Sequence, residues 1–276
     1  MTLSFPPFTR WVKRLIIICA AVYFLEVVLG AVFSGEIQHK ANLYLGLVPA
    51  WVLFRGFVWQ LATYSFLHDS MGHLLVNMLT LWMFGSQEEQ DWGSPKFLEF
   101  YFFCVIGAAL VTVGVAYTGL PGASPIVPTI GASGGIYGLL IAFGMLYGDR
   151  EVFLFPFPFS IKAKYLVAII IFVVVVATFQ PSEGGVANFA HLGGLLFGFL
   201  YIKFVPARGL MFGLSERYFS VRNDYYRWKR RRAAKKFEVY MREHDRDVHF
   251  DEHGNYIPPE DDARKGNGGS KSGWVN

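Results

Sequence analysis

Six apolar runs of membrane-spanning length limit what this chain can fold into. A helix needs about 20 mostly apolar residues to cross a hydrocarbon core of roughly 30 Å. Runs of this kind occupy residues 13–33, 69–86, 97–118, 131–148, 163–180 and 187–205. The pattern therefore predicts an all-α, polytopic membrane protein with six transmembrane helices.

The composition divides the chain into a membrane body and a charged tail. Hydrophobic residues make up 53% of the 276 residues and charged residues only 17%, which is a low charged share for a soluble protein. Residues 1–206 carry ten Lys/Arg and ten Asp/Glu, whereas residues 207–276 carry fifteen and eleven, so the net charge of +4 belongs to the tail. We expect a cytoplasmic N-terminus at 1–12, a six-helix membrane domain at 13–206 and a basic tail at 207–276.

The positive charges predict the orientation of the spans. Arg10, Lys13 and Arg14 precede the first apolar run, which places the N-terminus in the cytoplasm. That run exceeds the usual length of a signal peptide and Glu26 interrupts it without a clean cleavage site, so we interpret it as a retained span. If all six runs cross, the basic tail is cytoplasmic too. Since no organelle-targeting segment is visible, a prokaryotic inner or plasma membrane is the simplest location.

A serine and a histidine lie where lipid-facing helices are expected. Ser133 opens the fourth apolar run and His191 lies near the start of the sixth. An ionisable histidine in hydrocarbon is costly and is usually retained for a function. A nucleophile and a candidate base in two different spans suggest covalent chemistry inside a membrane.

Small residues recur around both side chains. In the fourth and sixth runs they form two stripes, Gly131, Gly134, Gly138 and Ala142 in one and Gly194 and Gly198 in the other. Such stripes usually indicate helix packing alone, because small side chains let two backbones approach closely. Beside Ser133 and His191, the same packing would bring a nucleophile and its base within hydrogen-bond reach.

The second run carries its own polar group, made of His68, His73 and Asn77. His73 and Asn77 are four residues apart, so a helix places both on one face. Hydrogen bonding between helices, worth about 0.6 kcal/mol, is one interpretation of this pair. A zinc site at His68 and His73 is another, although their spacing differs from His-x-x-x-His and no third ligand is evident.

Three elements on three predicted spans resemble the rhomboid family of intramembrane serine proteases. They are Gly131-Ala132-Ser133-Gly134 with Gly138, Ala190-His191 with Gly194 and Gly198, and the series His68, His73 and Asn77. They occur in the family's order, and the resemblance covers roughly residues 10–206. It implies a rhomboid-like bundle in which Ser133 is the nucleophile and His191 the general base, without the acidic third member of a soluble triad.

The resemblance also implies roles around this dyad. The side chains of His73 and Asn77 and the backbone N–H of Ser133 would stabilise the oxyanion. His68 would support the site, and Tyr137 matches the position whose ring packs against the catalytic histidine. The supporting glycines are Gly131, Gly134, Gly194 and Gly198.

One position departs from the family pattern. The first outer loop of the family often carries Trp-Arg, whereas Trp59 is followed here by Gln60. The charged partner is missing, and we expect Trp59 to anchor the loop at the level of the lipid headgroups. Glu89, just after the second run, matches the family's acidic position near the inner end of that span.

The resemblance implies an endopeptidase that cleaves transmembrane helices near the outer membrane face. Its substrates would be single-pass or polytopic membrane proteins, and it would need no cofactor or metal. Inactive relatives lose the serine or the histidine, and this chain keeps Ser133 and His191. The alternative is a catalytically silent rhomboid-like protein that binds membrane helices or serves in quality control.

Cys19 and Cys104 lie in predicted spans without a redox motif, so we expect them to serve only in packing between helices.

The tail combines positive charge with aromatic side chains. Its basic residues between 227 and 236 follow Tyr225 and Tyr226 and flank Trp228. We interpret this segment as an orientation signal or a contact with anionic lipid, in preference to a nucleic-acid site. His244, His249 and His253 match no recognised metal-site spacing, and the residues from 258 onward are expected to be disordered.

Overall fold

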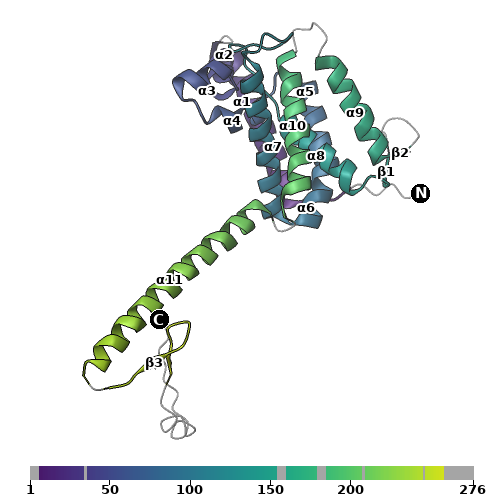
Figure 1. Cartoon of the computed structure of the whole chain (residues 1–276). Coiled ribbons are helices and arrows are strands. Elements are labelled where there is room, and N and C mark those ends of the chain that lie inside the picture. The colour runs from purple at the N-terminus through teal and green to yellow at the C-terminus, as the bar shows by residue number, and fades with distance from the viewer. Residues whose placement is uncertain are drawn as a thin grey trace. The chain divides into compact units, whose positions relative to one another are not determined.

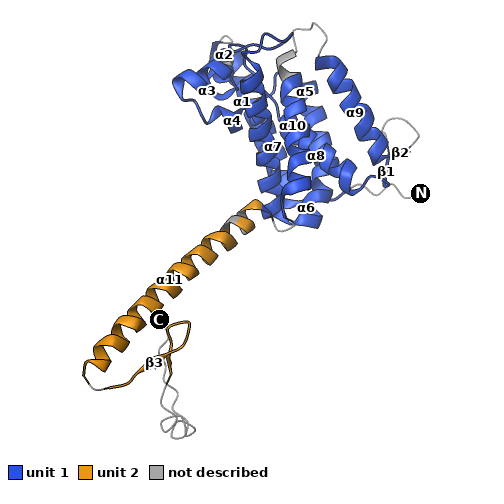
Figure 2. Ribbon diagram, in the orientation of Figure 1, with its two compact units in different colours: residues 1–209 blue, residues 210–276 orange. Residues whose placement is uncertain are grey.

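The computed structural model divides the chain into two compact units, which Figure 2 colours separately. Unit 1 spans Met1–Gly209 and unit 2 spans Leu210–Asn276. The structure describes residues 6–33, 36–153, 160–178, 185–206, 209–244 and 246–257. The end that we expected to be disordered, from residue 258 onward, lies outside the described residues.

A helix lies at each of the six apolar runs (Figure 1). These helices are α1 (Arg10–Val32), α5 (Met71–Thr80), α7 (Ser94–Val115), α8 (Ser133–Leu146), α9 (Ala163–Thr178) and α10 (Gly185–Phe204). Helix α5 continues through a π-helical turn, η2 (Leu81–Gly85), into α6 (Ser86–Trp92). Two described helices, α1 and α7, are long and apolar enough to cross a membrane, whereas α8 and α9 have 14 and 16 residues. The prediction of a mostly helical chain is confirmed.

The segment between the first two apolar runs is folded into short helices. It contains α2 (Glu36–Leu45), α3 (Pro49–Arg55), α4 (Gln60–Thr63) and the 3-10 turn η1 (Tyr64–Phe66). A β-bridge pairs Leu47 with Thr129, so this segment is tied to the chain just ahead of α8. The sequence analysis did not predict these helices, because helices this short depend on tertiary contacts for their stability.

A two-stranded antiparallel hairpin precedes α9. Strand β1 (Glu151–Phe153) pairs with β2 (Ser160–Lys162). The Nζ atom of Lys164 donates to Oδ1 of Asp149 at 2.6 Å, and Nζ of Lys162 lies 3.6 Å from the same oxygen. The hydrogen bond from Lys164 lowers the pKa of the Asp149 carboxyl below its usual value, so this exposed carboxylate is ionised at neutral pH.

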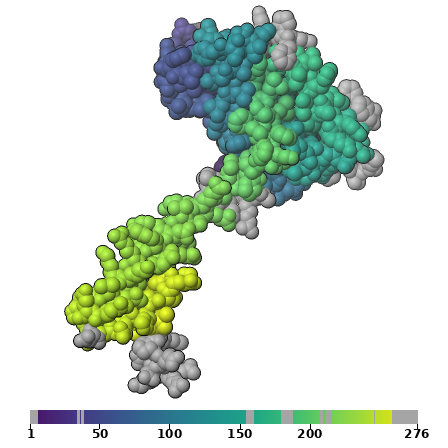
Figure 3. Space-filling model, in the orientation of Figure 1, coloured from purple at the N-terminus to yellow at the C-terminus, as the bar shows by residue number. Residues whose placement is uncertain are grey.

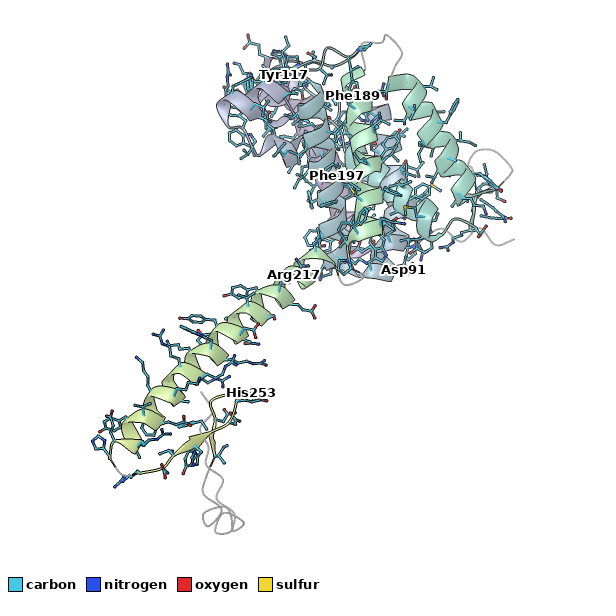
Figure 4. All side chains as sticks on the ribbon, in the orientation of Figure 1. Asp91, Tyr117, Phe189, Phe197, Arg217 and His253 are labelled. Atoms are coloured by element: carbon cyan, nitrogen blue, oxygen red, sulfur yellow. The ribbon has the colours of Figure 1, made fainter. Side chains whose placement is uncertain are left out.

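Helix α10 forms the centre of unit 1. It packs most extensively against α7 and α8, and it also contacts α9. In the space-filling view, α10 lies between the surfaces of α7 and α9 (Figure 3). The ring of Phe197 on α10, labelled in Figure 4, packs against Gly107 of α7. A Cβ atom on Gly107 would lie only 2.1 Å from the Phe197 Cγ atom, so this position has no room for a side chain. This packing holds α10 against the rest of the bundle.

Glycines on α10 and α8 let the two backbones touch. A Cβ atom on Gly194 would lie 2.1 Å from the carbonyl oxygen of Gly134. One turn further along, a Cβ on Gly198 would lie 2.8 Å from the Cα atom of Gly138. The two stripes of small residues seen in the sequence therefore face each other, and they hold the helices that carry His191 and Ser133.

The carboxylate of Glu89 joins three helices at the opposite end of the bundle. It accepts hydrogen bonds from the backbone N–H groups of Trp11 and Val12 in the first turn of α1, at 3.0 Å. It also accepts from the hydroxyls of Thr9 and of Ser94, the first residue of α7. Burial raises the pKa of Glu89, but these donors outweigh burial and lower the pKa below its usual value. The carboxylate therefore caps α1 from α6.

Unit 2 consists of a long helix and a small hairpin. Helix α11 (Leu210–Arg242) is followed by the antiparallel pair β3 (His249–Phe250) and β4 (Tyr256–Ile257). The Phe250 ring packs against Phe237 of α11 with 6.2 Å between centroids. The described residues hold no group of three His, Cys, Asp or Glu side chains that could bind a metal, those of this unit included. The sequence predicted a basic tail here, but neither its long helix nor the hairpin that covers one face of that helix.

Substitution of Gly194 by alanine tests the contact between α10 and α8. The added methyl group would collide with the backbone of α8, which cannot rotate away, so we expect a loss of about 1–3 kcal/mol of stability. Thermal unfolding of the purified protein measures it. Gly114→Ala in α7 is the control, because a Cβ there meets nothing within 4 Å. Equal unfolding temperatures for both variants would contradict this packing.

Candidate active site

Ser133 is the first residue of α8, at the end of a loop held by backbone hydrogen bonds. The N–H of Gly131 donates to the carbonyl of Tyr64 at 2.9 Å, which joins this loop to η1. Gly131 has a φ of +123°, a backbone conformation that residues other than glycine rarely adopt. Because Ser133 is in the first helical turn, its backbone N–H has no partner within the helix and can serve as a donor to a ligand.

His191 and Ser133 form a hydrogen-bonded pair across the α8–α10 contact. The Nε2 atom of His191 lies 2.9 Å from Oγ of Ser133, although the residues are 58 apart in sequence. Tyr137, one turn along α8, stacks on the imidazole of His191 with 4.4 Å between ring centroids. The structure thus brings together a hydroxyl, an imidazole and a ring that limits the imidazole's rotation. A serine hydroxyl bonded to an imidazole is the arrangement that nucleophile activation requires.

His73 and Asn77 lie on α5, on the other side of Ser133. The Nε2 atom of His73 is 2.8 Å from the point that a Cβ on Gly131 would occupy, and Ser133 Oγ is 3.7 Å from that same point. Asn77 is buried, and its Nδ2 atom has no hydrogen-bond partner among the residues the structure describes. An asparagine that served only to join two helices would use this donor. This buried donor is therefore available to a ligand.

His68 is buried beside His73 and does not reach Ser133 through any described contact. The two imidazole rings meet edge to face with 5.1 Å between centroids. Neither ring nitrogen of His68 has a hydrogen-bond partner among the described side chains and backbone. Within that part of the chain, no third side chain completes a metal-binding group around these histidines.

Asp69 is a residue of the site that the sequence analysis missed. Its Oδ1 atom lies 2.8 Å from Nδ1 of His73. Ser70, the N-cap residue of α5, accepts a hydrogen bond from the backbone N–H of His73 and donates one to Asp69. The spacing of four residues between Asp69 and His73 is the signal that could have identified the pair.

Gln60 fixes the backbone of the segment between α1 and α5. Its side chain is buried, its Oε1 atom accepts from the N–H of Val48 at 3.0 Å, and its Nε2 atom donates to the carbonyl of Leu43 at 2.7 Å. The indole N–H of Trp59 donates to the carbonyl of Tyr44 at 2.9 Å. A neutral amide thus ties this segment together through two backbone groups.

The fold and the site together define a mostly helical protein with a hydrogen-bonded serine–histidine pair. Residues 55–208, more than half of the chain, match the family model described as "Rhomboid domain". The chain therefore belongs to the rhomboid family and is an integral membrane protein.

The relatives found by comparison include rhomboid proteins from bacteria, plants and yeast. The chain is 30% identical to the rhomboid protease AarA of Providencia stuartii over 67% of its own length and 69% of that protein. It is 32% identical to the rhomboid protease GluP of Bacillus subtilis over 60% of its length. It is also 32% identical to RHOMBOID-like protein 4 of Arabidopsis thaliana over 51%. The chain spans about a third of each of the last two proteins, 30% and 32%.

Substitution of Gly131 by alanine tests whether the space beside Ser133 must stay open. The methyl group would lie 2.8 Å from Nε2 of His73, in the space where an oxyanion would be held. We expect labelling of Ser133 by a fluorophosphonate to slow by about a hundredfold, the usual effect of losing an oxyanion donor. Gly119→Ala is the matched control, since Gly119 also has a positive φ but borders open space. If both variants slowed equally, backbone strain alone would explain the effect.

Proposed function

We propose that this chain is an intramembrane serine endopeptidase that uses Ser133 and His191 as a catalytic dyad. The observation that carries the proposal is the 2.9 Å separation between His191 Nε2 and Ser133 Oγ inside an apolar bundle. Membership of the rhomboid family and relatives named rhomboid proteases support the same reaction class.

In the proposed first step, Ser133 Oγ attacks the carbonyl carbon of a peptide bond while His191 Nε2 takes the hydroxyl proton. The carbonyl π electrons move to oxygen, and this oxyanion is held by the backbone N–H of Ser133 and the side chains of His73 and Asn77. The tetrahedral species collapses, the C–N bond breaks, and His191 gives its proton to the leaving amine. Tyr137, stacked on the imidazole, keeps His191 oriented through both proton transfers.

Water completes the proposed reaction by attacking the acyl-enzyme. His191 removes a proton from this water, the tetrahedral species collapses, and Ser133 Oγ leaves with the proton from His191. The partial exposure of His73, 29% of its side chain, gives water a polar approach to the site. This dyad needs no third acidic residue because Tyr137 stacks on His191 and limits its rotation.

We propose that all six apolar segments cross the membrane, with both termini cytoplasmic. Ser133 and His191 then lie near the outer ends of α8 and α10. A peptide bond in a transmembrane helix is protected by its own hydrogen bonds, so a substrate must unwind locally to present an extended segment to Ser133. A prokaryotic inner or plasma membrane remains the proposed location, and reporter fusions at the C-terminus test this orientation.

The alternative function is binding or quality control of membrane helices without cleavage. Such a protein would use the same bundle but would not need a serine hydroxyl bonded to an imidazole. The buried amide of Asn77 also favours an enzyme, because it has no hydrogen-bond partner among the described residues and a buried donor without a partner is costly unless a ligand uses it.

Cleavage of a model transmembrane substrate in proteoliposomes tests the proposed function. We expect Ser133→Ala and His191→Ala to reduce cleavage by about 10⁴-fold or more, as for other serine hydrolases. Ser220→Ala, on the exposed face of α11, is the control and should cleave as the wild type does. Cleavage by Ser133→Ala at the wild-type rate would show that the serine is not the nucleophile, and absence of cleavage by the wild type would favour the silent alternative.

We also propose that the basic face of α11 binds anionic lipid headgroups. Trp228, Arg231, Arg232, Lys235 and Lys236 line one face, and the hairpin covers another through Phe237. In nanodiscs, we expect this face to be protected from hydrogen exchange by anionic lipid but not by zwitterionic lipid. A variant with Arg231→Glu and Lys235→Glu should lose this protection. Equal protection in both lipids, or tighter binding to an RNA oligonucleotide, would contradict the proposal.

A further inference from the structure

Tyr64 lies beside Ser133 but takes no part in the proton transfers described above. It is the first residue of η1, and its side chain is buried. Its backbone carbonyl accepts the N–H of Gly131, two residues before the serine. Its hydroxyl oxygen lies 2.6 Å from the point that a Cβ on Gly134, the residue after the serine, would occupy. Tyr64 therefore lies against the chain on both sides of Ser133.

The hydroxyl of Tyr64 also joins this part of the chain to α7. It donates to the carbonyl of Val105 at 2.8 Å in the interior of the bundle. About one turn further along α7, a Cβ on Gly134 of α8 would lie 2.8 Å from the Ala108 Cβ atom. A Cβ on Gly193 of α10 would lie 2.8 Å from the Ala108 Cα atom. The part of α7 that accepts from Tyr64 thus lies against both helices of the proposed dyad.

The first turn of α8 is held from two sides. On one side, the carbonyl of Gly134 faces Gly194 of α10, three residues beyond His191. On the other side, Gly134 lies against the hydroxyl of Tyr64. A turn held from one side alone could shift away from α10, and a displacement of about 1 Å can lower the rate of a reaction about a hundredfold.

We infer that Tyr64 is a positioning residue whose hydroxyl holds the first turn of α8, so that Ser133 stays within reach of His191. This inference rests on the proposed function and deepens it. It assigns to the reaction a residue outside the dyad and outside the proposed oxyanion donors.

The hydroxyl of Tyr64 can be removed without removing the ring. In Tyr64→Phe the backbone carbonyl can still accept the N–H of Gly131, and the ring still fills its buried place. The carbonyl of Val105 keeps its hydrogen bond within α7, as carbonyls inside a helix do. The substitution therefore removes the bond between η1 and α7 and little else.

The kinetics of fluorophosphonate labelling of Ser133 test the inference. The end point of labelling counts the folded, reactive serines, whereas the rate constant measures how reactive each of them is. We expect Tyr64→Phe to reach the wild-type end point with a rate constant about tenfold lower. With a model transmembrane substrate, kcat per labelled serine should fall by the same factor, and KM should stay within about twofold. A lower end point at an unchanged rate constant would show a merely structural role and would overturn the inference.

Tyr201→Phe is the matched control. Tyr201 is another buried tyrosine, ten residues beyond His191 on α10, and its hydroxyl donates to Oε1 of Glu99 at 2.6 Å. We expect its labelling rate constant to match that of the wild type. Equal slowing of Tyr64→Phe and Tyr201→Phe would mean that losing any buried tyrosine hydroxyl loosens the bundle, which contradicts a specific role for Tyr64.

A methyl group on residue 134 tests the same contact from the side of α8. The atoms of other elements nearest to a Cβ on Gly134 are the Tyr64 hydroxyl oxygen at 2.6 Å, the Ala108 Cβ at 2.8 Å and the Tyr64 Cζ at 3.7 Å. In an Ala108→Gly background, Gly134→Ala would therefore collide with the hydroxyl alone. Adding Tyr64→Phe there should raise the labelling rate constant severalfold, the opposite of its effect in the wild type. An unchanged or lower rate constant would count against the inference.

Cleavage by the wild type and by Ser133→Ala separates the inference from the proposed function. If both cleaved the model substrate equally, the proposed function and the inference would fall together. If only the wild type cleaved it, but Tyr64→Phe was labelled with the wild-type rate constant, the inference alone would fall.

Discussion

The direct backbone contact between α8 and α10 is the interaction on which the rest of the site depends. Gly194 faces the carbonyl of Gly134, and Gly198 faces Gly138, at separations that leave no room for a side chain. A serine and an imidazole have short side chains, and they form a 2.9 Å hydrogen bond only because their helices approach this closely. In a lipid environment such packing is itself a source of stability, so the same contact serves both fold and site.

Two buried polar side chains hold segments of unit 1 together. Glu89 accepts hydrogen bonds from the first turn of α1 and from Ser94 of α7. Gln60 ties together the segment between α1 and α5 with hydrogen bonds to its backbone. Between these anchors the bundle is apolar enough for the Ser133–His191 hydrogen bond to form with little competition from water.

Much of this arrangement could be predicted from residue types and spacing. The six apolar runs each coincide with a helix, and the glycine stripes around Ser133 and His191 predicted which two helices meet. The helices between α1 and α5 could not be predicted, because their stability comes from contacts with distant segments. The amide of Gln60 is a similar case, since its partners are backbone atoms of a loop whose path the sequence does not reveal.

Asp69 illustrates a different limit. Its spacing of four residues from His73 is visible in the sequence, but only the structure shows that Asp69 Oδ1 lies 2.8 Å from His73 Nδ1.

The structure of a phosphonate adduct shows directly whether Ser133 is the nucleophile and whether His73 and Asn77 face the oxyanion. We expect a covalent bond from Ser133 Oγ to phosphorus, with the phosphoryl oxygen within hydrogen-bond distance of His73 Nε2 and Asn77 Nδ2. An adduct on another residue, or a phosphoryl oxygen turned away from both donors, would contradict it.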